Sequence, residues 1–554
     1  MRAGSGLRTL LPGRHDYAAL RTSWRADLLA GVTVGVVALP LALAFGVSSG
    51  VGAEAGLVTA IVAGLVAAVL GGSHVQVSGP TGAMVVVLAP IVATHGAGAV
   101  PVVALLAGAL VVVAGVLRLG RLVGMIPWPV IEGFTLGIAI LIFLQQVPAA
   151  VGVPAAGHDA NAAVAALQSL GEATAPDALW SAGVVASVVA VMLLAPRVHP
   201  AVPGSLVAIT LVTVVTAVAH LPVATIGALP AGLPAPAWPT VDLTTLAGLT
   251  GPAVTVAALA AIESLLSARV ASSHASTGPY DADRELVGQG LASVASGLFG
   301  GMPATGAIAR TAVNVSSGGR TRVAAVVHAL VLLVVVGSLS GVVAHVPLPA
   351  LAGVLMVTAV RMVSARGVRL VVRSTRAAAA LFTLTAVVTV SIDLVYAVGV
   401  GIVVAAALSL RAMARAAGVH REELPGPPVA GDERIALFRV EGPLFFAAAE
   451  RVLERVAAID GVSVVVLRLS QVQLLDATGA QVLGELVAGL HRRGVTVLVK
   501  GLQPDHLGLA RRVGVLDPLD DDQVFAHLDE AVGHARRVVA LDTRLASAVG
   551  TPAA

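Results

Sequence analysis

Two short stretches, QVSGPTGA at residues 76–83 and GMPATGAIAR at residues 301–310, interrupt the hydrophobic pattern of this chain in the same way. Each contains a proline and a Thr-Gly-Ala triplet, which begins at Thr81 in the first stretch and at Thr305 in the second. Glycine and proline break a membrane helix, and the backbone groups they release are tolerated only beside protein or a cavity. A matched pair of breaks points to a transporter's binding site. We therefore expect two half-helices whose N-termini face each other across an anion.

The composition is that of a membrane protein. Of the 554 residues, 57% are hydrophobic and 12% are charged, and the charged fraction is about half that of an average soluble protein. The chain has no cysteine, which excludes disulfides and cysteine-bound metals. The net charge of +3 is small, so we expect no nucleic-acid partner. No cofactor or metal site is expected either.

Apolar residues are concentrated in runs of about 18 or more, the length that crosses a bilayer. We predict seven spans in each half of a transmembrane domain over residues 26–411. Those of the first half are 27–49, 55–72, 78–93, 100–117, 127–148, 179–195 and 201–219. Those of the second half are 250–269, 286–300, 304–317, 323–343, 348–360, 376–392 and 394–411.

The arginines of the loops predict the orientation of these spans. Residues 1–25 contain five arginines, whereas loops 149–178 and 220–249 contain neither lysine nor arginine. Cytoplasmic loops carry an excess of basic residues, so residues 1–25 are expected in the cytoplasm and the protein in the plasma membrane. The loops expected on the same side carry Arg118 and Arg121, then Arg197, Arg269 and Arg284, Arg320 and Arg322, and Arg361, Arg366, Arg369 and Arg373.

An odd number of spans per half makes the second half enter the membrane from the opposite side. The two halves, about 26–220 and 250–411, then form an inverted repeat. A second repeated word supports this prediction, because Val-Thr-Val occurs at residues 32–34 and again at 254–256. Its offset along the sequence agrees within two with the offset from Thr81 to Thr305.

The composition changes after Arg411. Residues 412–432 are polar and predict a linker, and residues 433–540 predict a small cytoplasmic α/β domain. Apolar segments at 435–440, 464–469 and 495–499 predict strands, and helical periodicity lies between them at 448–458 and 478–492. Alternation of strand and helix predicts a parallel sheet. Residues 541–554 are predicted to be a disordered tail.

Helix N-termini attract anions through unpaired N–H groups and about half a positive charge. Hydroxyl and amide side chains could add donors, and Arg310 could select the sign of the ion. As an alternative, glycine and proline could serve only close helix packing, and Arg310 could snorkel to the interface. The predicted anion-binding residues are Gln76, Ser78, Gly79, Thr81, Gly82, Ala83, Thr305, Gly306, Ala307, Ala309 and Arg310.

Glu263 is the most informative acidic residue, because it lies in the middle of an apolar run. Burial disfavours the charged form of a carboxyl group, so Glu263 could take up a proton and couple it to anion movement. Alternatively, ionised Glu263 with Ser267 could hold Na⁺, or Glu263 could form a structural ion pair with Arg310. We find no spacing typical of a catalytic triad or a metal site, and the protein is not expected to be an enzyme.

Five ordered motifs resemble the SulP anion permease family. They are DLLAGVTVGVVALP (27–40), QVSGPTGA (76–83), AIESLLSA (261–268), ELVGQG (285–290) and TGAIARTAVN (305–314). The resemblance implies a seven-plus-seven fold with core and gate domains, elevator-like alternating access, a homodimer, and an anion held between spans 3 and 10.

The C-terminal domain resembles the family's STAS domain. LDATG at residues 475–479 is similar to the Asp-Ser-Ser-Gly loop of anti-sigma-factor antagonists, with Ala477 as a departure. The resemblance makes Asp476 and Thr478 candidates for a phosphorylation switch. Capping of the following helix is the simpler interpretation.

Family members carry different anions through similar sites. Sodium-coupled bicarbonate carriers of the family resemble this chain but place Asp where Glu263 stands, which favours proton-coupled symport of sulfate or a C4-dicarboxylate. A sodium-coupled bicarbonate transporter and an anion exchanger are alternatives. A non-transporting signalling protein and a uracil or xanthine permease are further hypotheses, against which the two breaks, Glu263, Arg310 and the STAS domain argue.

Overall fold

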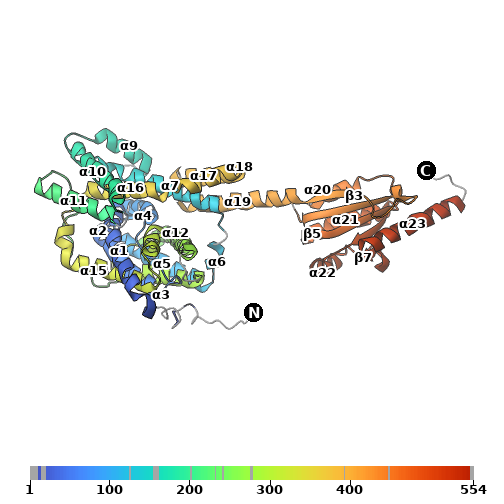
Figure 1. Ribbon diagram of the computed structural model, residues 1–554, viewed down its shortest axis with the longest axis horizontal. Coiled ribbons are helices and arrows are strands. Elements are labelled where there is room, and N and C mark those ends of the chain that lie inside the picture. The colour runs from blue at the N-terminus through green and yellow to red at the C-terminus, as the bar shows by residue number, and fades with distance from the viewer. Residues whose placement is uncertain are drawn as a thin grey trace. The chain divides into compact units, whose positions relative to one another are not determined.

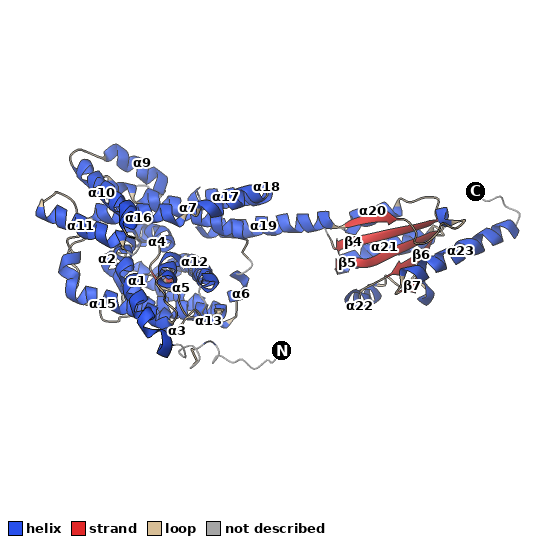
Figure 2. Cartoon of the chain, viewed as in Figure 1, coloured by secondary structure: helices blue, strands red, loops and turns tan. Residues whose placement is uncertain are grey.

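The computed structural model describes residues 10, 12–13, 20–123, 126–153, 161–199, 202–230, 232–239, 242–274, 279–391, 394–446 and 449–548. The chain divides into two compact units, residues 1–402 and 403–554. The first unit is helical apart from one very short sheet, and the second contains a five-stranded sheet with helices (Figures 1 and 2).

The helices of the first unit follow the predicted apolar segments closely. They are α1 (Leu20–Ser48), α2 (Ala53–Val58), η3 (Thr59–Ala63), α3 (Gly64–Leu70), α4 (Gly82–His95), α5 (Ala99–Val116), α6 (Gly120–Val123), α7 (Trp128–Gln145), α8 (Val147–Ala150), α9 (Ala162–Glu172), α10 (Asp177–Val198), α11 (Gly204–Val218), α12 (Leu243–His274), α13 (Ala282–Leu298), α14 (Ile308–Ser316), α15 (Arg322–Val343), α16 (Leu348–Met362), α17 (Ala365–Ser374), α18 (Arg376–Ser391) and α19 (Leu394–Ala416). Helices α6, α9 and α17 lie in segments for which the sequence predicted only loops, and α19 continues past Ile402 into the second unit.

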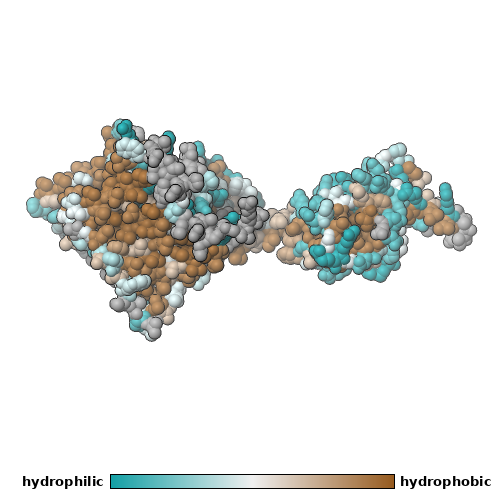
Figure 3. All heavy atoms as spheres, turned by 90° about the horizontal axis from the view of Figure 1, so that it is seen from below, coloured by the Kyte–Doolittle hydropathy of each residue, from teal (hydrophilic) through white to brown (hydrophobic). Residues whose placement is uncertain are grey.

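The unit has the surface of a membrane protein. Within the described residues, nine helices are long and apolar enough to cross a membrane, and α4, α11 and α18 are shorter apolar helices. On the face shown in Figure 3, hydrophobic residues cover much of this unit. In a bilayer every backbone group must be satisfied internally, which helices achieve. The chain is therefore a multi-pass helical membrane protein, and the number of fourteen spans stays a prediction.

Most helix contacts fall within two groups, which also touch each other where α1 packs against α11 and α16 and where α4 packs against α7. The first group contains α1 to α5 and α12 to α15, and the second contains α7, α10, α11, α16 and α18. In the first group α1 packs against α15, and α12 packs against α5. The step in sequence from the start of α1 to the start of α12 equals the step from the start of α5 to that of α15. These two contacts are therefore equivalent in the predicted repeat.

The two breaks meet in the first group as a short antiparallel sheet. Strand β1 (Ser78–Gly79) pairs with β2 (Thr305–Gly306), with Ser78 opposite Gly306 and Gly79 opposite Thr305. The breaks are matched, but their triplets are not equivalent. Thr81 is the N-cap residue of α4, whereas Thr305 lies in β2, two residues before Ala307, the N-cap residue of α14.

The second unit is a layered α/β domain. Strands β3 (Gly418–Glu422), β4 (Ile435–Leu444), β5 (Val464–Leu475), β6 (Thr496–Lys500) and β7 (Val524–Phe525) form one sheet in that order, and only β3 is antiparallel to its neighbour. Alternate residues of β5 pack on opposite faces. Val465 and Leu467 contact α21 (Ala477–Arg492) and α22 (Pro504–Val513) in one core, and Val464 and Val466 contact α23 (Leu528–Ala548) in the other. Helix α20 (Ala449–Ala457) joins β4 to β5.

Two predicted boundaries of this domain differ from the structure. The predicted linker 412–432 contains the end of α19 and strand β3, whose polar residues pair with β4 and were therefore not recognised as a strand. The predicted tail begins at 541, but α23 continues to Ala548, and its residues Asp542 and Thr543 contact Arg434 of the domain. Residues 549–554 lie outside the described residues.

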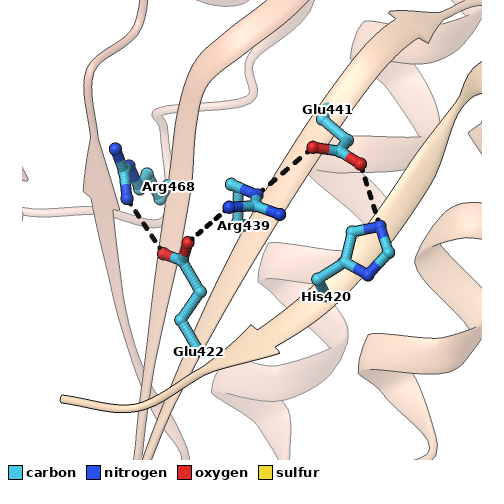
Figure 4. A network of polar contacts seen from close by, with 5 residues as sticks. All are labelled: His420, Glu422, Arg439, Glu441 and Arg468. Carbon is cyan, nitrogen blue, oxygen red and sulfur yellow. Dashed lines mark hydrogen bonds and ion pairs between the residues drawn. The ribbon is translucent and has the colours of Figure 1, made fainter.

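Charged residues form a network on the sheet face against which α23 packs, at the end of that face beyond the α23 core (Figure 4). The register places Arg439 of β4 directly opposite Arg468 of β5, and like charges in that arrangement repel each other. The carboxylate of Glu422 contacts both guanidinium groups, at 2.8 Å and 3.0 Å. Glu441 contacts Arg439 at 3.2 Å and His420 at 2.9 Å. Glu422 and Glu441 therefore stabilise a pairing that the strand register alone would disfavour.

Asp476 caps α21. Its Oδ1 atom accepts a hydrogen bond of 2.7 Å from the Gly479 backbone N–H, and Oδ2 accepts one of 3.2 Å from the N–H of Phe446. Thr478 is exposed in the first turn of the helix. The capping interpretation of Asp476 thus has a structural basis, and a phosphorylation switch stays a hypothesis.

We expect Asp476→Ala to destabilise the start of α21 by about 1 kcal/mol, the usual value of an N-cap side chain. Hydrogen exchange of the purified protein, followed by mass spectrometry, should show faster exchange in residues 477–482. Thr478→Ala is the matched control and should leave that exchange rate unchanged. Faster exchange in the threonine variant alone would contradict the assignment.

Candidate anion site

The site is built around a buried carboxylate on α12. Glu263 has 9% of its surface exposed. Its Oε2 atom accepts a hydrogen bond of 2.8 Å from the hydroxyl of Thr81 and one of 2.9 Å from the hydroxyl of Thr305. One oxygen atom of a single acidic side chain therefore connects Thr81, the N-cap residue of α4, with Thr305, which lies two residues before the N-cap residue of α14.

Both half-helices lack a side-chain cap. The hydroxyl of Thr81 donates to Glu263 and makes no capping bond to α4, and the N-cap residue of α14 is Ala307, which has no polar side chain. The first N–H groups of a helix have no partner within the helix. These two N-termini are therefore candidate donors to an anion, and anion binding there stays a prediction.

The termini differ in their surroundings. At the start of α4, Gly82 is packed so closely against Ile142 of α7 that a side chain at this position would collide with it. The first turn of α14 is open, with Ile308 40% exposed and Ala309 exposed. Gly82 and Ala83 therefore lie where the first helix group meets the second, and Ala309 lies on an accessible surface.

Arg310 joins the two half-helices from the side of α14. Its side chain is almost fully buried, with 2% exposed, and its Nη2 donates to the carbonyl oxygen of Pro80, directly before α4. Nη1 has no hydrogen-bond partner among the described residues. Unpartnered buried donors are rare in proteins and call for an explanation. Snorkelling to the interface does not describe this side chain.

An ion pair between Arg310 and Glu263 does not occur in the described part of the chain, where Glu263 is held by the two threonines. The structural ion-pair interpretation therefore lacks a direct contact. Both charges still belong to the same small region, because Pro80 is the neighbour of Thr81 in sequence.

Ser267 lies one turn beyond Glu263 and has a different partner. Its hydroxyl lies 3.3 Å from that of Thr311, which accepts a hydrogen bond of 3.0 Å from the Val77 N–H. Ser264, which the sequence analysis did not select, accepts a hydrogen bond of 3.1 Å from the N–H of Gly306. The structure thus uses these hydroxyls to attach β1 and β2 to α12 and α14, and it does not bring Ser267 to the carboxylate.

Gln76 and Ser78 flank this arrangement. The side chain of Gln76 is buried against Gly306, and neither of its amide atoms has a hydrogen-bond partner among the described residues. The hydroxyl of Ser78 accepts a hydrogen bond from Nε2 of Gln289 in α13. The same amide nitrogen donates to Glu285 at 3.0 Å. Ser78 therefore attaches β1 to α13, which was not expected.

The buried polar residues Glu285 and Gln289 hold the segment before β1. Glu285 accepts hydrogen bonds from the N–H groups of Gly72 and Ser73, at 2.7 Å and 2.9 Å. On the opposite side, Asn314 donates to the carbonyl oxygen of Val75 at 2.7 Å. The spacing of Glu285 and Gln289, four residues apart in a predicted span, is the sequence signal that could have identified them.

The backbone conformation of residue 79 and its closeness to Arg310 require a glycine at this position. Its φ of +150° is rare for residues with a side chain, and a Cβ atom there would lie 2.7 Å from Nη1 of Arg310 and 3.3 Å from the Cα atom of Ala60. Any side chain would therefore displace the guanidinium group or the strand.

We expect Gly79→Ala to reduce anion uptake about tenfold or more, since backbone strain alone costs of the order of 1–3 kcal/mol. Uptake by proteoliposomes, normalised to folded protein, is the measurement. Gly183→Ala serves as control because a Cβ atom there meets no other atom within 4 Å. Normal uptake by the Gly79 variant would mean that Arg310 does not need its observed position.

The fold and the site define a multi-pass membrane protein with two uncapped half-helices, a buried acid and a buried base, followed by an α/β domain. Residues 24–385 match the sulfate permease family, and residues 427–531 match the STAS domain. The chain belongs to the sulfate permease family, and its C-terminal domain is a STAS domain.

Two relatives match over most of their length. YvdB of Bacillus subtilis (strain 168), which is named as a candidate sulfate transporter, is 35% identical over 525 residues, 92% of this chain and 97% of YvdB. The bicarbonate transporter BicA of Synechocystis is 32% identical over 503 residues, 86% of this chain and 88% of BicA.

Solved structures have the same fold. The transmembrane domain of a cyanobacterial bicarbonate transporter BicA covers 68% of this chain and 97% of its own, with 34% identity and a TM-score of 0.62. The murine anion transporter Slc26a9, in the inward-facing state, covers 97% of this chain and 96% of its own, with a TM-score of 0.83. Its 17% identity shows likeness of fold alone.

Proposed function

We propose that the protein is a secondary active anion transporter that carries sulfate together with a proton. The observation that carries this proposal is the shared acceptor, because Thr81 and Thr305 both donate to one carboxylate oxygen of Glu263. A proton on that carboxyl group changes the hydrogen bonds of Thr81, the N-cap residue of α4, and of Thr305, in the strand that precedes α14. The protonation state of Glu263 is thereby linked to the place where the anion binds.

The balance of charge supports coupling to a proton. Arg310 contributes one positive charge, and two helix N-termini contribute about half a charge each. Together they match a divalent anion only if Glu263 is neutral, so sulfate binding favours a protonated Glu263. A buried charge without compensation is costly, and the same argument applies to a C4-dicarboxylate.

Bicarbonate is the second candidate substrate, and the likeness to BicA over most of the chain favours it. A monovalent anion balances the same positive groups with Glu263 ionised. Transport of bicarbonate would therefore need no proton on Glu263. If Glu263 binds Na⁺ instead, the two threonine hydroxyls, rather than Ser267, are its nearest oxygen partners.

We further propose that the first helix group moves as a body against the second. All of the proposed binding residues lie on α4, α12, α14 or the segments that lead into α4 and α14, and Gly82 contacts α7 of the second group. Movement of one helix bundle as a rigid body against another is a known form of alternating access. A homodimer, with residues 1–25 and the STAS domain in the cytoplasm, completes the proposal.

Uptake by proteoliposomes tests the function. Vesicles containing the purified protein receive labelled sulfate, bicarbonate, succinate or fumarate, under an inward proton gradient or an inward Na⁺ gradient. We expect sulfate uptake that depends on the proton gradient. Bicarbonate uptake driven by Na⁺ alone would favour the second candidate, and no uptake of any of these anions would favour a non-transporting signalling protein.

A further inference from the structure

Helix α17 (Ala365–Ser374) is a short helix between two apolar ones. Val363 and Ser364 have extended backbone conformations, so α16 ends before them, and the Ser364 hydroxyl caps α17 by accepting a hydrogen bond of 3.0 Å from the Gly367 N–H. Helix α18 begins at Arg376, directly after α17. Because α16 and α18 are apolar helices of the membrane unit, α17 connects their ends at a membrane surface.

The two sides of α17 are chemically different. Gly367 and Val371, one turn apart, are buried. Arg366, Arg369 and Arg373 are exposed, and their spacing of three and four residues places them together on the opposite side of the helix. We call these three arginines the basic face of α17.

Apolar residues border the basic face. Leu370 is 55% exposed and Val372 is 50% exposed. A helix with a basic polar face and exposed apolar residues beside it is typical of helices that lie in the membrane interface. Long arginine side chains reach the headgroups from there while their apolar neighbours contact the acyl chains.

The basic face is not neutralised by the protein. In the part of the chain that the structure describes, no hydrogen bond or ion pair engages the guanidinium groups of Arg366, Arg369 or Arg373. The acid that approaches the helix, Glu132, contacts the buried side at Gly367 and accepts a hydrogen bond of 3.0 Å from the indole of Trp128. The charge of the basic face is therefore available to a partner outside the protein.

Trp128 is an independent marker of the membrane boundary. It begins α7 and is 46% exposed. Tryptophan is enriched at the level of the lipid headgroups. The indole of Trp128 donates a hydrogen bond to Glu132, and Glu132 lies beside Gly367 of α17. Helix α17 therefore lies at the same depth in the membrane as this indole.

We propose that the basic face of α17 binds the phosphate headgroups of anionic phospholipids. Guanidinium groups suit this ligand because their planar N–H groups match phosphate oxygens in pairs. Basic residues near a membrane surface are attracted to anionic lipid. The site does not depend on which anion is carried, and a lipid bound there would hold the connection between α16 and α18.

The test uses the full-length protein in a neutral detergent. Its melting temperature is followed while phosphatidylglycerol or phosphatidylcholine is added in mixed micelles. We expect stabilisation by phosphatidylglycerol, with weaker binding at higher salt. The combined variant Arg366→Gln, Arg369→Gln and Arg373→Gln should require about a hundredfold more phosphatidylglycerol for half of the effect. Replacing the same residues with lysine should restore part of the effect, because lysine keeps the charge but not the planar donor group.

Three exposed arginines of the STAS domain provide a matched control, because the combined variant Arg455→Gln, Arg511→Gln and Arg512→Gln makes the same change in charge elsewhere. It should respond as the unmodified protein does. Equal stabilisation by both lipids, or an unchanged response of the α17 glutamine variant, would overturn the proposal. The proposal would also be overturned if the STAS variant lost as much of the response as the α17 glutamine variant, or if soluble glycerol phosphate gave the same stabilisation.

Discussion

Arg310→Ala should lower the affinity for the transported anion about a hundredfold or more. The guanidinium group is buried, and Nη1 has no acceptor among the described residues. Removing one member of a buried charge pair costs of the order of 2–5 kcal/mol, and a factor of ten in affinity corresponds to about 1.4 kcal/mol. The concentration dependence of sulfate uptake by proteoliposomes measures the effect. Arg310→Lys should recover part of the affinity, because it keeps the charge but not the planar donor group.

Arg322 offers a matched control. It is buried to the same extent, with 2% exposed, and its Nη1 donates to the carbonyl oxygen of Ala68 at the end of α3. Arg322→Gln should lower the melting temperature of the protein while the folded fraction binds sulfate as before. If Arg310→Ala keeps the affinity of the unmodified protein, Arg310 has a structural function only.

Glu263→Gln should uncouple transport from the proton gradient. A glutamine has nearly the same shape, and its carbonyl oxygen can still accept from Thr81 and Thr305, so the half-helices should stay in place. For one coupled proton, each pH unit of gradient can raise the accumulation ratio about tenfold. We expect uptake by the unmodified protein to rise as external pH falls, because protonation of Glu263 accompanies binding. In the variant the ratio should no longer follow the gradient.

Glu285 is the control for this experiment, since it is also buried, with 1% exposed, but holds the N–H groups of Gly72 and Ser73. Glu285→Gln should lower stability by about 1.5–3 kcal/mol, the value of hydrogen bonds to a charged group, and should keep the proton dependence. The reverse outcome, with coupling lost in the Glu285 variant and kept in the Glu263 variant, would assign the proton to Glu285.

Much of the membrane unit could be predicted because hydrophobic runs and loop arginines are one-dimensional signals. The same signals placed Glu263 and Arg310 inside the membrane unit, where both are buried. Polar partners could not be predicted in this way. The hydroxyl of Ser78 contacts Gln289, which is 211 residues away, and that of Ser267 lies beside Thr311 rather than Glu263.

That the two Thr-Gly-Ala triplets are not equivalent could also be seen only in the structure. Identical words in a chain rich in small residues do not fix a register, and the strand pairing places Thr305 opposite Gly79 instead of Thr81. The hydrogen bonds to Glu263 nevertheless bring both threonines together. In the C-terminal domain, β3 was not recognised because its residues, GVHRE, are mostly polar and it is stabilised by pairing with β4.

Simultaneous recording of sulfate uptake and internal pH tests the central claim most directly. Proteoliposomes with a pH indicator inside start at equal pH on both sides, and sulfate is added outside. If sulfate and a proton move together, the lumen should become acidic as sulfate enters, and Glu263→Gln should abolish the acidification. Entry of sulfate through the unmodified protein without any change of internal pH would contradict proton-coupled transport.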